Sequence, residues 1–475
     1  MDIPPQAKVL VKAGLESRIL LRDNPKYAAC TASYFDNASK LQPACFLQPC
    51  TALEAARAIQ VLANAGQRFA VRSGGCTVRP GSNNINDGVT IDLSLLNSVE
   101  YNDDETAHIG TGATWDQVYD ELEKHDRVAA GGRVAGVGVG GYLLGGGFSF
   151  HTGRHGLGCD NVVSYQLALA DGRLITVSAR EHEDLFHALK GGGNNFGIVT
   201  RFTVKTFPNS KIWGGLSFKA VDVLPAAAEA LVEFTTHASE DEDSTMLLLA
   251  ANMPKHGGTG VVMLTYNAGG VEKPRAFDKC MSIPEIFSQY QTTRIQEFLP
   301  FDQLPWPRDM LNVWYTLTFK NDAGLIMRAS EQLYKFGEEL QTQTSDFTTH
   351  VAFQPIPRLY AEKAAATGGN VLGLEKIPYD AIMLQASVSV KTVEVADWVR
   401  PRFKAFVDDL RAFIASRDGL VPWTYLNYAH ASQDVFQGYG EENVNAMREV
   451  AVRYDPQGIF QSLCIGGHKI SASGT

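Results

Sequence analysis

Glycine occupies twelve of the twenty-eight positions from Gly131 to Gly158. Each glycine loses backbone entropy on folding and adds no side chain to a core, so an ordinary helix or strand does not tolerate this density. Such a stretch does offer bare main-chain N–H groups, which can approach a ligand closely and surround phosphate oxygens. The run therefore predicts a site for a long, flat cofactor that carries phosphate.

Two more glycine-rich segments, residues 72–77 and 191–197, support this interpretation. A dinucleotide has a diphosphate and two ring systems, so we expect more than one loop to converge on it. Residues 136–141 loosely match a dinucleotide-binding fingerprint. However, no strand leads into the motif and no acidic residue follows at the required distance, which argues against a Rossmann domain. A glycine-rich loop with a purely structural role is the alternative.

Charge and hydropathy exclude several classes of protein. The chain has 42 basic and 52 acidic residues, a net charge of −10, and no basic patch of the kind that binds nucleic acid. It has no apolar segment of about 18 residues, the length that spans a bilayer. The first residues do not form a signal peptide, so we expect a cytoplasmic protein, or a secreted one if a signal has been removed.

The seven cysteines are scattered along the chain and odd in number. This pattern is not typical of a disulfide framework, and no pair has the spacing of zinc ligands. We therefore predict no metal site.

The elements that must position the glycine loops follow from periodicity and end signals. Thr51 and Glu54 form a capping box ahead of an apolar stripe at Ala55, Ala58, Ile59 and Leu62, which predicts a helix over residues 51–65. Asp171 and Gly172 favour a hairpin turn. We further predict strands over residues 68–71, 89–93, 107–111, 163–170, 174–177 and 198–206, and helices over 114–125 and 441–454.

After residue 208 glycines become rarer, and strands at 246–251 and 260–266 alternate with amphipathic helices at 325–340 and 395–414. Pro401 either kinks the second of these helices or marks its true start. The pattern is typical of an α+β domain with antiparallel strands. We predict a first domain over residues 1–208, a substrate domain over 209–420, and a return to the first domain over 421–475.

Several motifs occur in an order that resembles the berberine-bridge-enzyme-like flavin oxidases of the vanillyl-alcohol-oxidase superfamily, in particular their fungal secondary-metabolism members. The resemblance covers about residues 40–208 and 420–462. The motifs are residues 71–75, 92–94, 138–141 with 145–147, Gly156 with 160–161, 192–197 and 425–428.

The resemblance implies a PCMH-type, two-lobed FAD-binding domain that is interrupted by an α+β substrate domain with an antiparallel sheet. It also implies FAD as cofactor, hydride transfer to flavin N5, and reoxidation by O2. The positions that it assigns to the cofactor are Arg72, Ser73, Gly74, Gly75, Cys76, Thr77, Gly136, Gly138, Val139, Gly140, Gly141, Gly145, Gly146, Gly147, Ser149, Asp160, Gly197, Ile198, Val199, Tyr425 and Asn427.

The chain departs from the family at both covalent attachment points. Relatives bond the flavin 8α-methyl through a histidine and C6 through a cysteine, whereas the matching positions here hold Cys76 and Val134. Valine forms no such bond, so we expect no C6 link. A Cys76 thiolate is chemically competent to form an 8α thioether. We expect noncovalent FAD, with Cys76 filling the space of the histidine.

Family members carry a base close to the flavin within a Tyr-x-Asn-Tyr segment, which matches Tyr425, Asn427 and Tyr428 here. If the segment is extended, Tyr425 and Asn427 share one face and Tyr428 lies on the other. We assign Asn427 to the cofactor and Tyr428 to the base, with packing at a domain interface as the alternative for Tyr428. His430 stands where many relatives have aspartate, and its imidazole is in a position to tune the base.

Two histidines of the glycine run, His151 and His155, are weaker candidates, since loop histidines are mostly structural. His350, Gln354, Tyr360 and Glu375 are polar residues in apolar surroundings that the sequence does not rank.

The leading hypothesis is an FAD-dependent oxidoreductase that acts on a small organic metabolite with O2, binding neither nucleic acid nor membrane. An isomerase or cyclase without net redox change is the alternative, because the usual flavin tethers are lost. A ligand carrier is a third. The sequence gives neither the substrate nor the oligomeric state.

Overall fold

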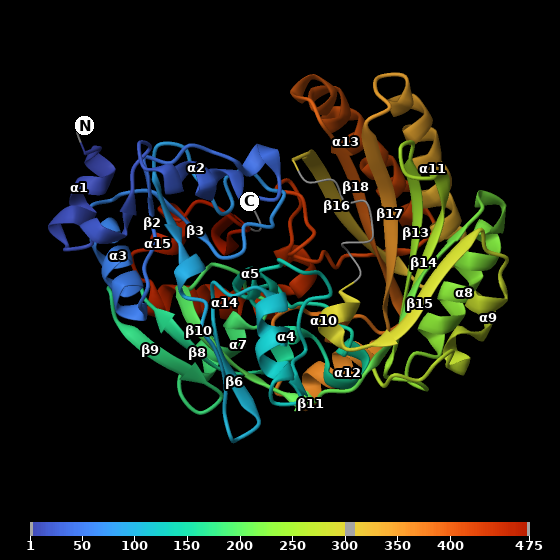
Figure 1. Cartoon of the computed structure of the whole chain (residues 1–475), viewed down its shortest axis with the longest axis horizontal. Coiled ribbons are helices and arrows are strands. Elements are labelled where there is room, and N and C mark those ends of the chain that lie inside the picture. The colour runs from blue at the N-terminus through green and yellow to red at the C-terminus, as the bar shows by residue number, and fades with distance from the viewer. Residues whose placement is uncertain (1–2, 300–308, 473–475) are drawn as a thin grey trace.

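The computed structural model describes residues 3–299 and 309–472, which form two lobes side by side (Figure 1). The first lobe contains the beginning and the end of the chain, and the second is built on one large sheet. The α+β class and the antiparallel sheet predicted for the second domain are both confirmed.

A four-stranded sheet in the first lobe delivers the first glycine loop. Its order is β1-β2-β4-β3, with β2 and β3 parallel to β4 and β1 antiparallel to β2. Between β2 and β3 lies α3 (Ala52–Asn64), which begins as predicted because the Thr51 side chain accepts a hydrogen bond from the Glu54 amide. The loop at Ser73 follows directly from β3. The strands are β1 (Ile19–Leu20), β2 (Cys45–Leu47), β3 (Phe69–Arg72) and β4 (Val89–Asp92).

The second sheet of this lobe has five antiparallel strands in the order β5-β6-β10-β8-β9. The turn at Gly172, whose φ is +87°, joins β8 to β9 as predicted. The glycine run lies between α4 (Trp115–Glu123) and β8, and contains the short helices α5 (Val139–Leu144) and α6 (Thr152–His155). The strands are β5 (Val99–Tyr101), β6 (Thr106–Gly110), β8 (Val162–Ala168), β9 (Leu174–Ser178) and β10 (Ile198–Lys205).

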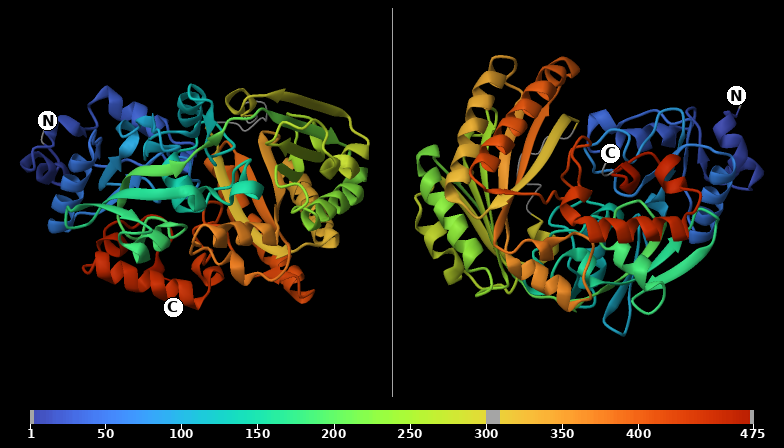
Figure 2. Two further views of the ribbon diagram at one scale, coloured as in Figure 1. Left: turned by 90° about the horizontal axis from the view of Figure 1, so that it is seen from below. Right: turned by 180° about the vertical axis from the view of Figure 1, so that it is seen from behind.

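The sheet of the second lobe has eight antiparallel strands in the order β15-β12-β14-β13-β17-β18-β16-β19. Four helices cover the face that points away from the first lobe (Figures 1 and 2). The strands are β12 (Ile212–Lys219), β13 (Ser244–Met253), β14 (Gly258–Asn267), β15 (Phe287–Thr293), β16 (Leu311–Lys320), β17 (Phe347–Ile356), β18 (Ala381–Val390) and β19 (Leu420–Val421). The helices are α8 (Leu224–Thr236), α9 (Asp278–Ser282), α11 (Ala323–Gln341) and α13 (Val393–Ser416).

The large sheet contributes to two cores because side chains alternate between the faces of a strand. In β14, Val261 and Met263 pack with the helices, whereas Val262, Leu264 and Tyr266 pack toward the first lobe. Strand β17 alternates in the same way. The face turned toward the first lobe is therefore the one that positions side chains for a site between the lobes.

Pro401 lies inside α13, so the alternative in which Pro401 marks the start of this helix is wrong. The helix begins earlier because the Thr392 side chain accepts a hydrogen bond from the Val395 amide. A proline inside a helix costs about 3 kcal/mol. The buried stripe that includes Ala396, Val399 and Phe403 offsets this cost.

The end of the chain returns to the first lobe, where α14 (Glu441–Tyr454) and α15 (Ile459–Ser462) lie among its earlier elements (Figure 2). The Phe69 amide donates to Leu463 O at 3.1 Å, and Tyr454 Oη donates to Asp184 at 3.0 Å. Helix 441–454 has its predicted bounds. The boundaries at residues 208 and 420 stay predictions.

Side chains also join the lobes directly. Asp36 is fully buried, and its Oδ1 accepts hydrogen bonds from the Asn312 amide at 2.9 Å and from Asn312 Nδ2 at 3.1 Å. Its other oxygen has no partner among the described residues. Burial raises the pKa of Asp36 to about 6.

Further elements are α1 (Pro5–Lys12), α2 (Pro25–Ala32), α7 (Glu183–Leu189), α10 (Ile295–Phe298), α12 (Arg358–Ala366), β7 (Arg127–Val128) and β11 (Phe207–Pro208).

Candidate active site

The two glycine loops touch. A Cβ on Gly74 would lie 2.5 Å from Gly138 N, and a Cβ on Gly138 would lie 2.4 Å from Gly74 N, so neither position has room for a side chain. Ser73 holds the loops together, because its Oγ donates to Thr111 O at 2.7 Å and accepts from Gly140 N at 3.3 Å. Segments that are distant in the sequence thus form one continuous backbone surface.

Part of this surface is open. Nothing lies within 4 Å of the Cβ position of Gly136, which has a φ of +76°, or of Gly141. Cys76 borders the same surface, with its Sγ 3.3 Å from Gly136 O and 3.6 Å from Gly74 O. A cradle of main chain without covering side chains fits a diphosphate, whose oxygens bind backbone N–H groups. The residues present therefore fit FAD.

Tyr425 and Asn427 hold the second half of the glycine run. Tyr425 Oη accepts a hydrogen bond from Gly147 N at 3.0 Å and another from Asn427 Nδ2 at 3.2 Å. A Cβ on Gly145 would lie 2.2 Å from Asn427 Oδ1, so this glycine allows the close approach of the amide. Burial raises the pKa of Tyr425, which keeps its phenol protonated at neutral pH.

Residues 425–428 are not extended, so the condition for placing Tyr428 on the opposite face from Tyr425 and Asn427 is not met. They form a turn, in which the Tyr428 and Ala429 amides both donate to Tyr425 O, at 3.1 Å and 3.0 Å. The rings of Tyr425 and Tyr428 consequently meet edge to face at 5.0 Å instead of lying on opposite faces. Tyr428 also packs edge to face on Trp314 of β16, at 6.2 Å. Unlike the buried Tyr425, Tyr428 keeps part of its surface accessible.

His430 stacks on Tyr315 at 4.3 Å between ring centroids, and its Nδ1 lies 2.8 Å from Ser432 Oγ. Burial, and then the charges of Arg79 and Lys404, lower the pKa of His430. The ring is therefore neutral at neutral pH. Its hydrogen bond goes to Ser432.

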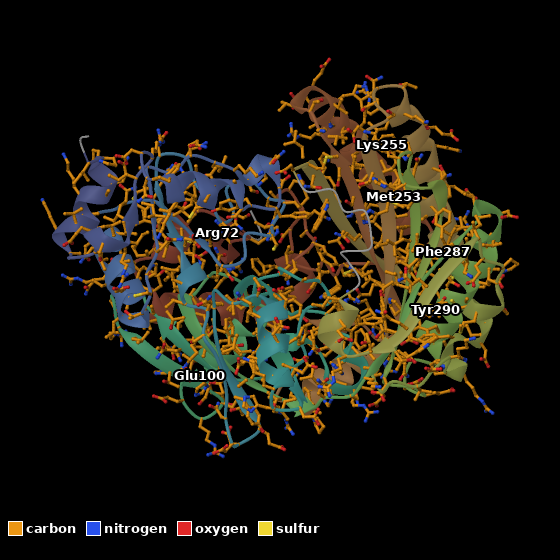
Figure 3. All side chains as sticks on the ribbon, in the orientation of Figure 1. Arg72, Glu100, Met253, Lys255, Phe287 and Tyr290 are labelled. Carbon is orange, nitrogen blue, oxygen red and sulfur yellow. The ribbon has the colours of Figure 1, made fainter. Side chains whose placement is uncertain are left out.

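Several predicted cofactor residues direct their side chains into the protein. The guanidinium of Arg72 donates to Cys30 O at 2.9 Å and to Ser33 Oγ at 2.7 Å, within the first lobe (Figure 3). Asp160 is buried and accepts from Leu157 N at 2.9 Å and Asn370 Nδ2 at 2.8 Å. The Ser149 hydroxyl accepts from the His151 amide. These hydrogen bonds shape the loops.

Other predicted positions belong to the supporting framework. Gly75 and Gly146 have positive φ values of +73° and +108°, and Val139 is buried at the start of α5. Thr77 Oγ1 accepts from the Arg79 backbone amide and from its Nε, both at 3.3 Å. Gly197 packs against Leu167, and Ile198 and Val199 pair with Ala168 and Leu167 in the five-stranded sheet.

Arg133 is a candidate that the sequence interpretation missed. Its Nη2 donates to Gln354 Oε1 at 2.8 Å, which joins the glycine run to β17 of the other lobe. Burial raises the pKa of Tyr360 to about 12, and the charge of Arg133 opposes that rise. The Oη of Tyr142, also near Arg133, is buried without a partner in the described chain. Nothing in the local sequence marks Arg133, because its partners come from the second lobe.

His151 and His155 line a separate cavity of about 310 Å³, together with Arg154, Phe207 and Asp243. None of its lining residues belongs to the loops at 73–77 or 136–141. His155 stacks on Phe207 at 3.6 Å, and burial lowers the pKa of each histidine to about 4.

Of the four polar residues that the sequence left unranked, Gln354 and Tyr360 lie near Arg133. His350 is buried in β17, and Glu375 is exposed.

Within residues 3–299 and 309–472, no cluster of histidine, cysteine and acidic side chains is arranged to hold a metal ion. None of the seven cysteines forms a disulfide. In the same residues, no helix has both the length and the apolar character that crossing a bilayer requires.

Residues 43–178 match the FAD binding domain family. An FAD-dependent monooxygenase of Aspergillus calidoustus is 32% identical over 471 residues, which cover 97% of this chain and 89% of the relative. Another FAD-dependent monooxygenase, from Cochliobolus heterostrophus strain C5, is 34% identical over 450 residues, which cover 90% of this chain and 85% of the relative.

Solved structures share the fold. The 6-hydroxy-D-nicotine oxidase of Arthrobacter nicotinovorans superposes with a TM-score of 0.77 at 20% identity, over 94% of this chain and 96% of that one. A variant of berberine bridge enzyme superposes with a TM-score of 0.77 at 18% identity, over 98% and 99%. The agreement extends over both lobes and the returning C-terminal segment.

Proposed function

Because this chain belongs to the berberine-bridge-enzyme-like, FAD-linked oxidoreductases, we propose that it oxidises a small organic metabolite by hydride transfer, with O2 as the final electron acceptor. We assign the reaction to secondary-metabolite biosynthesis. The observation that carries the proposal is the bare backbone cradle at Gly74 and Gly138, beside a tyrosine that keeps part of its surface accessible.

The main chain of residues 73–76 and 136–141 would hold the diphosphate, and Asn427 and Tyr425 would fix the loop at 145–147. When bound, FAD accepts a hydride at N5 and returns the two electrons to O2, which leaves as peroxide. Tyr428 would take the hydroxyl proton of the substrate at its Oη as the C–H bond breaks. Tyr425 is unsuited to that role, because it is buried and already accepts two hydrogen bonds.

We propose that FAD is bound noncovalently. The Cys76 Sγ contacts two backbone carbonyls, Gly136 O and Gly74 O, to which a thiol S–H group can donate and a thiolate cannot. Only the thiolate is the nucleophile that a thioether requires. Acid precipitation of the holoprotein is expected to leave a yellow supernatant. A yellow pellet that becomes colourless in Cys76→Ala would instead establish the thioether.

The electron acceptor can be tested without knowing the substrate. The holoenzyme is reduced photochemically under anaerobic conditions and mixed with air-saturated buffer, while flavin absorbance and peroxide are recorded. We expect reoxidation faster than that of free reduced FAD, with about one peroxide per flavin, as the two-electron balance requires. Reoxidation no faster than that of the free cofactor would contradict an oxidase.

Two other functions have specific support. The absence of both usual tethers, at Cys76 and Val134, favours the isomerase or cyclase alternative, in which product forms without oxygen uptake. The curated relatives are named FAD-dependent monooxygenases, which favours incorporation of one oxygen atom into the product. Turnover under ¹⁸O2 separates the three functions, because the label appears in peroxide, in the product, or in neither.

A further inference from the structure

Arg79 lies on the loop that follows Cys76, and no carboxylate of the described residues balances its charge. Its Nε bonds Thr77 Oγ1 at 3.3 Å, whereas its Nη1 is buried and has no hydrogen-bond partner in the described chain. Burial lowers the pKa of Arg79 to about 10, and no carboxylate in residues 3–299 or 309–472 opposes that shift. The side chain is still charged at neutral pH, and a half-buried guanidinium whose Nη1 lacks a counter-ion among the described residues is unfavourable.

His468 comes from the C-terminal segment and lies beside the same loop. A Cβ on Gly466 would be 2.4 Å from Gly81 O, so the two backbones are in direct contact. The Asn195 side chain donates to His468 O at 3.0 Å and fixes the segment. His468 Nε2 is also buried without a partner among the described residues. Arg79 is close enough to contribute to the lowered pKa of both His468 and His430.

Aromatic rings lie next to His430, which is close to both members of this pair. His430 stacks on Tyr315, and Tyr428, two residues before it, meets Trp314 edge to face. Trp314 and Tyr428 are both partly exposed, so part of their surface is available for contact. The surroundings thus combine uncompensated N–H donors with aromatic surface, beside the tyrosine assigned as base.

We propose that Arg79 and His468 form a binding site for the carboxylate of an aromatic acid, and that this group belongs to the substrate. The inference rests on the proposed function, since it names the substrate class of that site. A charge-assisted pair with a planar carboxylate is the interaction that a guanidinium makes best. The cofactor diphosphate is the other possible oxyanion, but it already has the bare backbone at 136–141.

The test uses benzoate as the probe and benzamide as its neutral analogue. Both are titrated into the holoenzyme by equilibrium dialysis with radiolabelled ligand, which does not depend on turnover. We expect benzoate to bind more tightly than benzamide. Arg79→Met is expected to weaken the binding of benzoate by about tenfold or more and to leave the binding of benzamide unchanged. Arg79→Lys is expected to retain part of the affinity for benzoate.

Arg173→Met is the matched control, because Arg173 is exposed and paired with Asp171. The FAD dissociation constant is measured for every variant. If Arg79→Met yields no folded holoenzyme, His468→Gln is measured in its place with the same ligands. We then expect the affinity for benzoate to fall by about fivefold.

Equal affinity of wild type and variant for benzoate would overturn the inference. So would a loss of FAD affinity with benzoate binding unchanged, which would assign the cluster to the diphosphate. Failure of the proposed function has a different signature, since it shows as absent peroxide in the reoxidation experiment while benzoate still discriminates the variants.

Discussion

Two tyrosines of one turn illustrate how burial divides roles between identical side chains. The Tyr425 phenol is enclosed and organises the glycine run through Gly147 N and Asn427 Nδ2. The Tyr428 ring rests on Tyr425 and Trp314, and its surface is partly accessible. We therefore place the proton-transfer step on Tyr428 and the positioning of the loop on Tyr425.

We predict that Tyr428→Phe lowers kcat by about 10²–10⁴-fold, the usual cost of removing a general base. The phenyl ring retains both aromatic contacts, so FAD affinity and thermal stability should not change. The measurement is the anaerobic rate of flavin bleaching with the substrate that a metabolite screen identifies. Tyr454→Phe, on the remote helix α14, is the control, and an unaltered rate in Tyr428→Phe would remove Tyr428 from the mechanism.

At the scale of elements, local signals were sufficient where the local sequence decides the structure. The capping box at Thr51 located α3, and Asp171 with Gly172 located the turn between β8 and β9. The conformation of residues 425–428 could not be predicted from the sequence, because two hydrogen bonds to Tyr425 O form a turn that no sequence pattern indicates. Arg133 was missed for a related reason, since its partner Gln354 lies on another lobe.

The contact between the glycine loops gives a prediction about cofactor binding. In Gly138→Ala the new Cβ would lie 2.4 Å from Gly74 N, so the loops must separate and the cradle is lost. We expect a large decrease in FAD affinity, measured by fluorescence titration of the apoprotein. Gly324→Ala is the control, because Gly324 lies in helix α11 of the other lobe and alanine is the better helix former. Equal FAD affinity in both variants would contradict the assignment of this surface.

The whole molecule depends on contacts between lobes that a single sequence does not reveal. The family resemblance was sufficient for the fold class. The domain boundary that glycine content suggests after residue 208 stays a prediction. The register of β14 and β17 decides which side chains face the site, and it became known only from the structure. The bond between Asp36 and Asn312 likewise joins residues that are 276 positions apart.

Asp36 makes the stability of the assembled lobes depend on pH. Its pKa is about 6 in the folded protein and 3.8 as the ordinary value, so between these limits the folded state holds a proton that the unfolded state has lost. Stability therefore falls as pH rises from about 4 to about 6 and stays lower above it. At pH 7.5 the ionised carboxylate costs roughly 2–3 kcal/mol.

Asp36→Asn should reduce this pH dependence, because the amide keeps the acceptor for Asn312 and does not ionise. The measurement is the free energy of unfolding of wild type and variant at pH 4 and pH 7.5. We expect the difference between the two proteins to change with pH in favour of the variant at pH 7.5. A difference that is the same at both pH values would show that Asp36 does not titrate between them.

The strand order of the large sheet constrains how the catalytic chamber opens. The chain enters the sheet at β12, next to one edge, and leaves it at β19, which is the opposite edge. Two chain crossings restrict the relative rotation of the lobes to the axis that joins the crossings, and the hydrogen bond between Asp36 and Asn312 is a further contact between the lobes. The lobes are therefore free to rock about that axis but not to separate independently of it.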